Sequence, residues 1–240
     1  MTRRRWIADE FNASSATLTG EQAGHLIRVL RVKPGMQYDI VAGDRVHRGS
    51  VAEVADNRVI FALHEEVEPD IALPVTLVLA VFKFDRLEWA IEKATELGVT
   101  AIVPIIASRT EKHLANSAEK RVERWRRIAH EAAQQSRRSH VPQVSDPRTL
   151  KTFLSAETRG AKQIVLAETE RVTMFQDCLS EDDTLTEIAI GPEGGWTVGE
   201  LSEFKEKGWQ AASLGPRILR AETAAIACVA IAAANLSVSS

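Results

Sequence analysis

The sequence has little cysteine, no long apolar run and no leader-like start, and each shortage excludes a class of protein. Its two cysteines, Cys178 and Cys228, are too few for a disulfide framework and lack metal-ligand spacing. The longest apolar tract, residues 224–236, falls short of the ~20 residues that a membrane span needs. No apolar stretch follows the basic N-terminus, so a signal peptide is not expected. We therefore predict a cytoplasmic protein.

Aromatic residues and the common nucleotide motifs are also scarce. Aromatic side chains make up 5% of the chain, which argues against a platform that stacks single-stranded bases. There is no Gly-x-x-x-x-Gly-Lys-Ser/Thr loop, and no Gly-x-Gly-x-x-Gly after the first strand of the α/β part. These absences weaken the ATPase, GTPase and dinucleotide-binding interpretations. The six histidines are scattered, so we expect no metal site.

The 240 residues, 45% of them hydrophobic, are enough for two unequal domains. Residues 1–72 are predicted to form a small β-barrel with one helix. That helix should begin at Thr19-Gly20-Glu21-Gln22, which has the spacing of a capping box. Short β-rich runs at 36–42, 46–54 and 59–63 follow, separated by turn signals. His25, Arg28 and Arg31 fall on the polar face of the helix, as a solvated face or as phosphate contacts.

Residues 73–240 alternate apolar runs with helical patterns, which predicts an α/β domain with a parallel sheet. Strands are expected at 75–82, 99–106, 164–167, 187–190 and 210–214. Helices are expected at 85–97, at 117–136, after Thr197 and from about Ala221. Nine basic and four acidic residues between positions 108 and 138 leave that segment with a charge of +5. A solvated helix face accounts for this charge as well as RNA contact does.

Three segments fall at the carboxyl ends of predicted strands, where open α/β sheets bind ligands. They start at Leu166, Ile190 and Leu214, and the last two each contain a Gly-Pro pair and open a helix. Glycine lets the backbone approach a ligand, and a helix N-terminus offers unpaired N–H donors. Plain tight turns are the alternative, but two such loops on neighbouring strands favour a ligand site.

At these loops the chain resembles a known family. Ile190-Gly191-Pro192-Glu193-Gly194-Gly195 and Leu214-Gly215-Pro216-Arg217-Ile218-Leu219-Arg220-Ala221-Glu222-Thr223-Ala224 are similar to motifs of the SPOUT-class RNA methyltransferases. His25-Leu26-Ile27-Arg28-Val29-Leu30-Arg31, Lys83 and Arg109 match other parts of the family, so the resemblance covers nearly the whole chain. Arg137 departs from it, because the family commonly has glycine after Gln-Ser. The resemblance is strongest to members that methylate N3 of a uridine in 16S ribosomal RNA.

The resemblance implies a PUA-like N-terminal barrel, residues 1–72, and an α/β domain, residues 73–240, whose end forms a trefoil knot. It also implies a homodimer and the cofactor S-adenosyl-L-methionine. The expected cofactor contacts are Leu166, Ala167, Glu168, Ile190, Gly191, Pro192, Glu193, Gly194, Gly195, Leu214, Gly215, Ile218, Leu219, Arg220 and Thr223. The expected contacts with ribosomal RNA, on the assembled small subunit, are His25, Arg28, Arg31, Lys83, Arg109, Arg137 and Arg138.

Methylation of a uridine N3 sets two demands. The donor and the base must be held near attack geometry, and the deprotonated imide must be favoured. A cation near a uracil oxygen stabilises that anion, and Arg220 is the candidate; the alternative is that it ties down the loop or pairs with Glu222. Glu222 is either a general base or, as we favour, an acid that complements the helix dipole.

Two other classes of protein fit the sequence less well. A non-catalytic RNA-binding protein would not need the two Gly-Pro loops. A phosphate-binding hydrolase would need an acid cluster or a nucleophile–base pair, and the sequence shows neither. The alanine-rich tract from Ala224 has small residues nearly all round, so we expect its helix to be buried, either at a subunit interface or within its own chain.

Overall fold

The computed structural model describes residues 5–43, 45–68, 72–136, 138–156, 160–180 and 185–236. The chain divides into two compact units. The first comprises residues 1–71 with 133–140, and the second comprises residues 72–132 with 141–240. The sequence pattern does not predict that residues 133–140 belong to the first unit, because they continue a helical periodicity that begins in the second unit.

The first unit contains one six-stranded sheet and one helix. The strands follow the order β1-β4-β5-β6-β3-β2, with β1 and β4 parallel and the other neighbours antiparallel. Leu18, Leu26, Ile40 and Phe61 form the centre of its core and are fully buried. The elements are β1 (Arg5–Ile7), β2 (Glu10–Phe11), β3 (Ser15–Thr19), α1 (Gly20–Arg28), β4 (Gln37–Ala42), β5 (Arg45–Ala55) and β6 (Arg58–Val67).

This sheet does not close into the predicted barrel. Among the described residues, β1 and β2 stand at opposite edges and are not paired with each other. They have three and two residues, so each offers few backbone groups for a closing ladder. The first unit is therefore an open, half-barrel sheet.

Helix α1 begins at Gly20, as predicted, but its cap and its C-terminal end differ from the prediction. Thr19 is the N-cap residue, but its side chain caps nothing; its N–H and Oγ1 instead donate to the Asp9 carboxylate, at 2.7 and 3.0 Å. The predicted capping box is therefore wrong, because Asp9 takes the hydroxyl. The helix ends at Arg28, and Arg31 lies beyond it in the left-handed region with φ of +50°. Arg31 thus does not share a helix face with His25 and Arg28.

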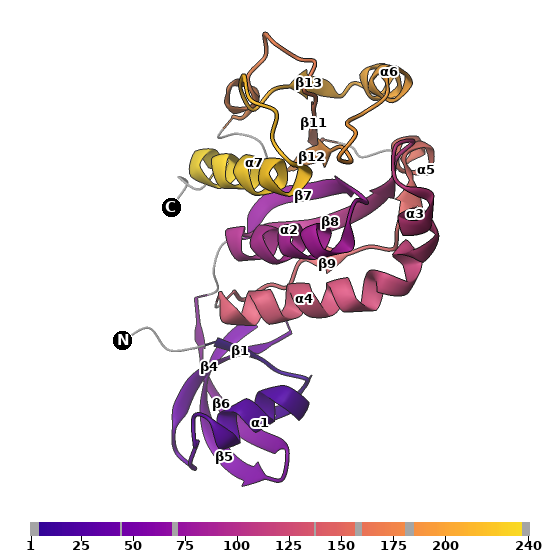
Figure 1. Ribbon diagram of the computed structural model, residues 1–240. Helices are drawn as coiled ribbons and strands as arrows, with labels where there is room; N and C mark the ends of the chain where they lie inside the picture. The colour runs from indigo at the N-terminus through magenta and orange to yellow at the C-terminus, as the bar shows by residue number, and fades with distance from the viewer. Residues whose placement is uncertain are drawn as a thin grey trace. The chain divides into compact units, whose positions relative to one another are not determined.

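The second unit is built on a seven-stranded sheet (Figure 1) whose order is β10-β8-β7-β12-β11-β13, with β9 also paired to β8. Every pairing in its described part is parallel, as predicted. The strands are β7 (Leu73–Ala80), β8 (Val99–Ile106), β9 (Gln143–Val144), β10 (Arg148–Thr149), β11 (Lys162–Leu166), β12 (Thr186–Ile190) and β13 (Gln210–Ala212).

The helices of this unit are α2 (Phe84–Leu97), α3 (Lys112–Ala118), α5 (Leu150–Ser155), α6 (Val198–Glu206), α7 (Ala221–Leu236) and the short 3₁₀ turn η2 (Phe175–Cys178). The helix expected over 117–136 is interrupted. A 3₁₀ turn, η1 (Glu119–Arg121), separates α3 from α4 (Val122–Gln135). No helix in the described ranges combines the length and apolar character that crossing a membrane requires.

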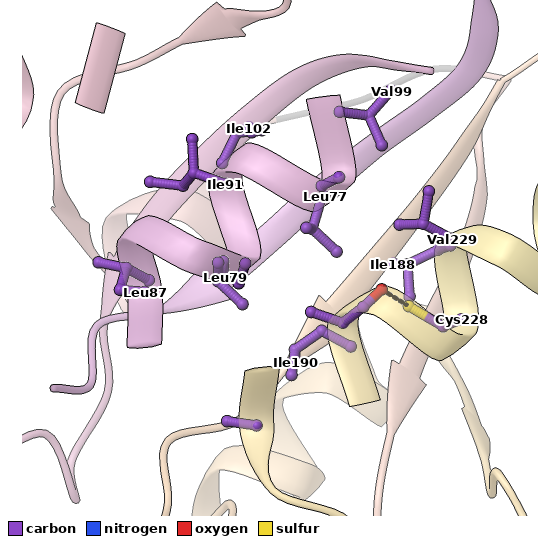
Figure 2. Close-up of a cluster of buried hydrophobic side chains, with 14 of the residues drawn as sticks. Leu77, Leu79, Leu87, Ile91, Val99, Ile102, Ile188, Ile190, Cys228 and Val229 are labelled. Carbon is purple, nitrogen blue, oxygen red and sulfur yellow. Dashed lines mark hydrogen bonds between the residues drawn. The ribbon is translucent and has the colours of Figure 1, made fainter. Parts of the chain in front are cut away.

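Both faces of the parallel sheet are covered, since alternate residues of a strand point to opposite sides. On one face, α2 and α7 pack side by side over Leu77, Leu79, Ile188 and Ile190 (Figure 2). On the other face, Val78, Ala80 and Ala189 join a second cluster with aromatic residues from α5, α6 and the segment before β13, namely Phe153, Phe204 and Trp209. The central strands are therefore buried on both sides, which explains their continuous apolar sequence.

Candidate functional site

A cavity of about 420 Å³ lies beyond the carboxyl ends of β11, β12 and β13. Its walls are the loops that follow these three strands and the first turn of α7. The three strands belong to one parallel sheet, so their following loops emerge at the same edge. The structure thus brings together three segments that are far apart in the sequence.

Thirteen of the fifteen expected cofactor residues line this cavity. The exceptions are Gly194, whose carbonyl oxygen accepts a hydrogen bond from Arg109, and Thr223, which is exposed on α7. Other lining residues were not expected from the sequence: Arg86, Thr169, Arg171, Trp196, Leu201, Ala212, Ser213, Arg217, Ala221 and Ala224. Trp196, Arg217, Ala221 and Ala224 lie within or beside the quoted motifs, whereas Arg86 comes from α2 and carries no local signal.

The loop after β12 approaches its neighbours too closely for side chains. The N–H of Gly195 donates to the carbonyl of Pro192 at 2.8 Å, and Gly195 has φ of +70°. A Cβ on Gly195 would lie 2.9 Å from Glu168 Oε1, and one on Gly191 would lie 3.2 Å from the Trp196 ring. The Trp196 indole in turn donates to the Leu166 carbonyl at 3.0 Å. Glycine at these positions therefore allows two cavity loops to meet.

Arg109 and Glu200 fix the backbone around this loop through hydrogen bonds. Arg109 Nη1 donates to the carbonyls of Gly194 and Trp196, at 2.5 and 3.3 Å. Glu200, which is 5% exposed, accepts from the Ser108 N–H at 2.7 Å and completes the predicted capping box with Thr197. Burial opposes ionisation of Glu200, but the hydrogen bonds from Ser108 and Thr197 outweigh it and lower the pKa.

The loop after β11 is also fixed by a carboxylate. Glu170 Oε1 accepts hydrogen bonds from the N–H groups of Arg171, Val172 and Thr173, at 2.9, 2.7 and 3.1 Å. These bonds, with that from Val172 the largest, lower the pKa of Glu170. An ionised Glu170 therefore orders the backbone that carries two cavity residues, Thr169 and Arg171.

The charged groups of the cavity are unevenly paired. Arg86 Nη1 donates to Glu193 Oε1 at 2.7 Å, and Arg86 Nε lies 3.8 Å from Glu222 Oε1. The Glu222 side chain is only 4% exposed, and its Oε2 has no hydrogen-bond partner. Arg220 is exposed, and its side chain makes no hydrogen bond or ion pair within the described residues, so the pairing of Arg220 with Glu222 is not formed.

The side chains that were expected to contact RNA differ in their exposure to solvent. His25 is half-buried, with its ring 5.9 Å from that of Trp6, and Arg28 is exposed at the end of α1. Arg31, Lys83 and Arg109 are exposed as well.

Arg137 and Arg138 are the remaining predicted RNA contacts. Arg138 is 4% exposed, which leaves its guanidinium little surface for a phosphate. Arg137 lies outside the described residues.

In the part of the chain that is described, no group of three or more His, Cys, Asp or Glu side chains is arranged to hold a metal ion.

Glycine loops beyond parallel strands, with a helix N-terminus at their side, define a site for a small organic ligand. The model of a family described as RNA methyltransferase domain matches residues 69–233, which include every cavity residue. The "Ribosomal RNA small subunit methyltransferase E" of Synechocystis sp. is 36% identical over 216 residues, covering 88% of this chain and 70% of its own. That of Bacillus subtilis is 33% identical, with 88% and 87% covered.

The chain therefore belongs to the RNA methyltransferase family, in the group named ribosomal RNA small subunit methyltransferase E. Two solved structures support the same placement. One, from Neisseria gonorrhoeae and described as bound to S-adenosyl methionine, has a TM-score of 0.84 at 29% identity and covers 95% of this chain and 96% of its own. Another, from Legionella pneumophila with the same cofactor, has a TM-score of 0.83 at 27% identity and covers 98% of both chains.

Proposed function

We propose that this protein transfers the methyl group of S-adenosyl-L-methionine to N3 of a uridine in 16S ribosomal RNA, with the assembled small ribosomal subunit as its substrate. The observation that carries the proposal is the cavity in which three loops meet, two of them glycine-bearing, in a chain of this family. A ribosomal substrate would place the protein in the cytoplasm.

The cavity residues fit this cofactor. The volume of about 420 Å³ lies within the ~300–1,000 Å³ that small-ligand sites occupy. Gly195 lets the loop after β12 approach Glu168 in the loop after β11, so both loops wall one cavity. The wall also offers both signs of charge, with Glu168 for an ammonium and Arg171 and Arg217 for a carboxylate. The bound cofactor would supply an activated methyl group.

The chain's own residues would provide orientation and charge. The loops starting at Leu166, Ile190 and Leu214 would hold the nucleoside through backbone groups. Arg220, which is exposed at the cavity wall, would stabilise the uracil anion through a ring oxygen. Glu222 is buried in the first turn of α7 and has no direct place in the cavity wall, which favours its role as an acid at the helix N-terminus over that of a general base.

The RNA would be held mainly through its phosphates. His25, Arg28 and Arg31 supply donors in the first unit, and Lys83 and Arg109 supply them in the second. Arg137 belongs to the proposed set as well, whereas the burial of Arg138 argues against a direct phosphate contact. We retain the interpretation of the first unit as a PUA-like RNA-binding domain in an open form. With 5% aromatic residues, shape and phosphate contacts would outweigh base stacking.

Two further properties of the family are proposed for this chain, a trefoil knot and a homodimer. The knot rests on the family; near the cavity, Ser213 bridges to Met174 and its N–H donates to the Thr173 carbonyl, so the segments that follow β11 and β13 lie side by side. The dimer is supported by α7. One face of this helix is buried, but Thr223, Ala230 and Ala234 form an exposed stripe of small residues that is available to a second chain.

The test offers tritiated S-adenosylmethionine with three substrates. These are small subunits from a strain that lacks the modification, the free 16S RNA from those particles, and tRNA. We expect the particles to be labelled best, at a single uridine. Equal labelling of free RNA, or better labelling of tRNA, would contradict the substrate and leave the methyltransferase activity standing.

A further inference from the structure

One charged side chain at the cavity belongs to none of its three loops. Arg86 lies in the first turn of α2, 104 positions before Ile190, where the loop after β12 starts. It nevertheless lines the same cavity. Its guanidinium contacts two carboxylates, Glu193 in the loop after β12 and Glu222 at the start of α7. The arginine therefore lies between the loop that walls the cavity and the helix that follows Arg220.

The two contacts are not equivalent. The bond to Glu193 is short, 2.7 Å, and both of its side chains are about one third exposed. The contact with Glu222 is longer, 3.8 Å, and that side chain is 4% exposed, with Oε2 unpaired. A buried carboxylate without compensation is costly, and Arg86 is the cation that lies beside Glu222. Arg86 is thus shared, and Glu222 depends on it.

Within the family's reaction, we propose that Arg86 is a positioning residue: it sets the spacing between the cofactor loop and the segment that carries Arg220, by pairing with Glu193 and Glu222 together. The inference rests on the proposed function, since it assigns Arg86 a part in methyl transfer. An arginine suits this place because its planar fork presents several donors in fixed directions, whereas a lysine presents a single point charge.

Removing the arginine has two separable consequences. The β12 loop loses its tie through Glu193, so the cavity is less preorganised and the cofactor binds more weakly. Glu222 is left as an uncompensated buried charge at the start of α7, so the folded state is less stable and the adjacent Arg220 is less well placed. The first consequence should appear in cofactor affinity, and the second in thermal stability and turnover.

The experiment is a pair of double-mutant cycles, with S-adenosylhomocysteine affinity measured by calorimetry. Arg86→Ala and Glu193→Gln should each weaken binding by about tenfold, and the double variant should be no weaker than either alone. Glu222→Gln added to Arg86→Ala should raise the melting temperature above that of Arg86→Ala, because it removes the lone buried charge. Arg86→Lys should recover part of both losses.

Turnover supplies the readout that distinguishes positioning from simple support of the fold. Arg86→Ala should raise KM for the cofactor and also lower kcat at saturating cofactor by several-fold. Arg58→Ala is the matched control for binding, because it removes an exposed pair with Glu10 in the first unit and should leave cofactor affinity unchanged.

Additive losses in the Arg86 and Glu193 cycle would overturn the proposal, because they would mean that Arg86 contacts the cofactor directly. A melting temperature unaffected by Glu222→Gln in the Arg86→Ala background would overturn it equally. Failure of the wild-type protein to label small subunits while these couplings persist would instead count against the proposed substrate.

Discussion

At Gly195 the backbone has φ of +70°, and the nearest atom to a Cβ would be a carboxylate oxygen of Glu168 at 2.9 Å. Gly195→Val should therefore strain the turn and displace the loop, with S-adenosylhomocysteine affinity falling by about a hundredfold or more. Calorimetry measures this directly. Gly199→Ala is the control, since its Cβ would meet nothing closer than 4.0 Å. An unchanged affinity for Gly195→Val would mean that Gly195 only forms a turn.

Arg220 is exposed at the cavity wall, and its side chain has no hydrogen-bond or ion-pair partner among the described residues, as suits a group kept for the substrate. We expect Arg220→Ala to lower turnover by about a hundredfold or more and to leave cofactor affinity nearly unchanged, which is the pattern of lost transition-state stabilisation. Single-turnover methylation and calorimetry on the same preparation check both. Parallel loss of affinity and turnover would assign Arg220 to the support of the loop.

At the level of the element, the first turn of α6 gives a prediction about pH. The Glu200 pKa lies below its ordinary value of 4.5, so the unfolded chain binds the proton more readily than the folded chain when the pH falls. The stability that Glu200 contributes is thus present above about pH 4.5 and is lost as the pH falls through the folded pKa. Both carboxylate oxygens of Glu200 accept hydrogen bonds, and an amide keeps only one acceptor oxygen, so Glu200→Gln should cost about 1 kcal/mol at neutral pH.

Melting temperatures between pH 6 and pH 3 test this prediction. The wild type should lose stability in acid more steeply than Glu200→Gln. Glu206→Gln, at the exposed end of the same helix, is the control and should follow the wild type. Identical acid slopes for Glu200→Gln and the wild type would show that the carboxylate contributes nothing through its ionisation.

Helix α7 gives a second prediction at this scale. Its exposed stripe of Thr223, Ala230 and Ala234 has little polar character, so a second chain would bury it with close helix approach. We expect a homodimer in light scattering at micromolar protein, and we expect Ala230→Arg to disrupt it. A mass near 26.4 kDa for the wild type would contradict the dimer.

The sequence predicted elements better than it predicted their ends. Apolar periodicity located the buried strands and α2, whose terminal Gly98 has φ of +112° as a C-terminal glycine should. The same cap signature was right at Thr197 and wrong at Thr19, because Asp9, ten positions earlier, competes for the Thr19 hydroxyl. Such long-range competition leaves no local trace in the chain.

The site was predictable where its residues stand in continuous motifs and not where they converge from a distance. The loops around Gly195 and Gly215 were found because glycines, prolines and a following helix lie together in the sequence. The contact of Arg86 with Glu193 and Glu222 joins three separate segments, so only the fold reveals it. The predicted barrel was wrong for a similar reason. The lengths of the edge strands β1 and β2 depend on pairing across the whole sheet, which a local pattern does not reveal.

At the scale of the whole molecule, the net charge of −3 conceals where the cations lie. Binding that neutralises phosphates releases counterions, so affinity should fall steeply with salt. Arg28→Ala combined with Arg31→Ala should flatten the logarithmic salt dependence of RNA binding by about two units of slope. Filter binding across a salt series measures this slope. A uniform loss of affinity with an unchanged slope would remove these arginines from the phosphate-contacting set.

The two cysteines have a consequence for following the motions of the second unit. Cys178 in η2 and Cys228 in α7 are buried, and burial raises the pKa of both thiols. Little thiolate is therefore present in the closed state, and an alkylating reagent can reach either sulfur only during a local opening. The two native thiols are thus built-in reporters of local opening. The rate at which each thiol is alkylated measures how often α7 or η2 detaches from the sheet, and no engineered cysteine is needed.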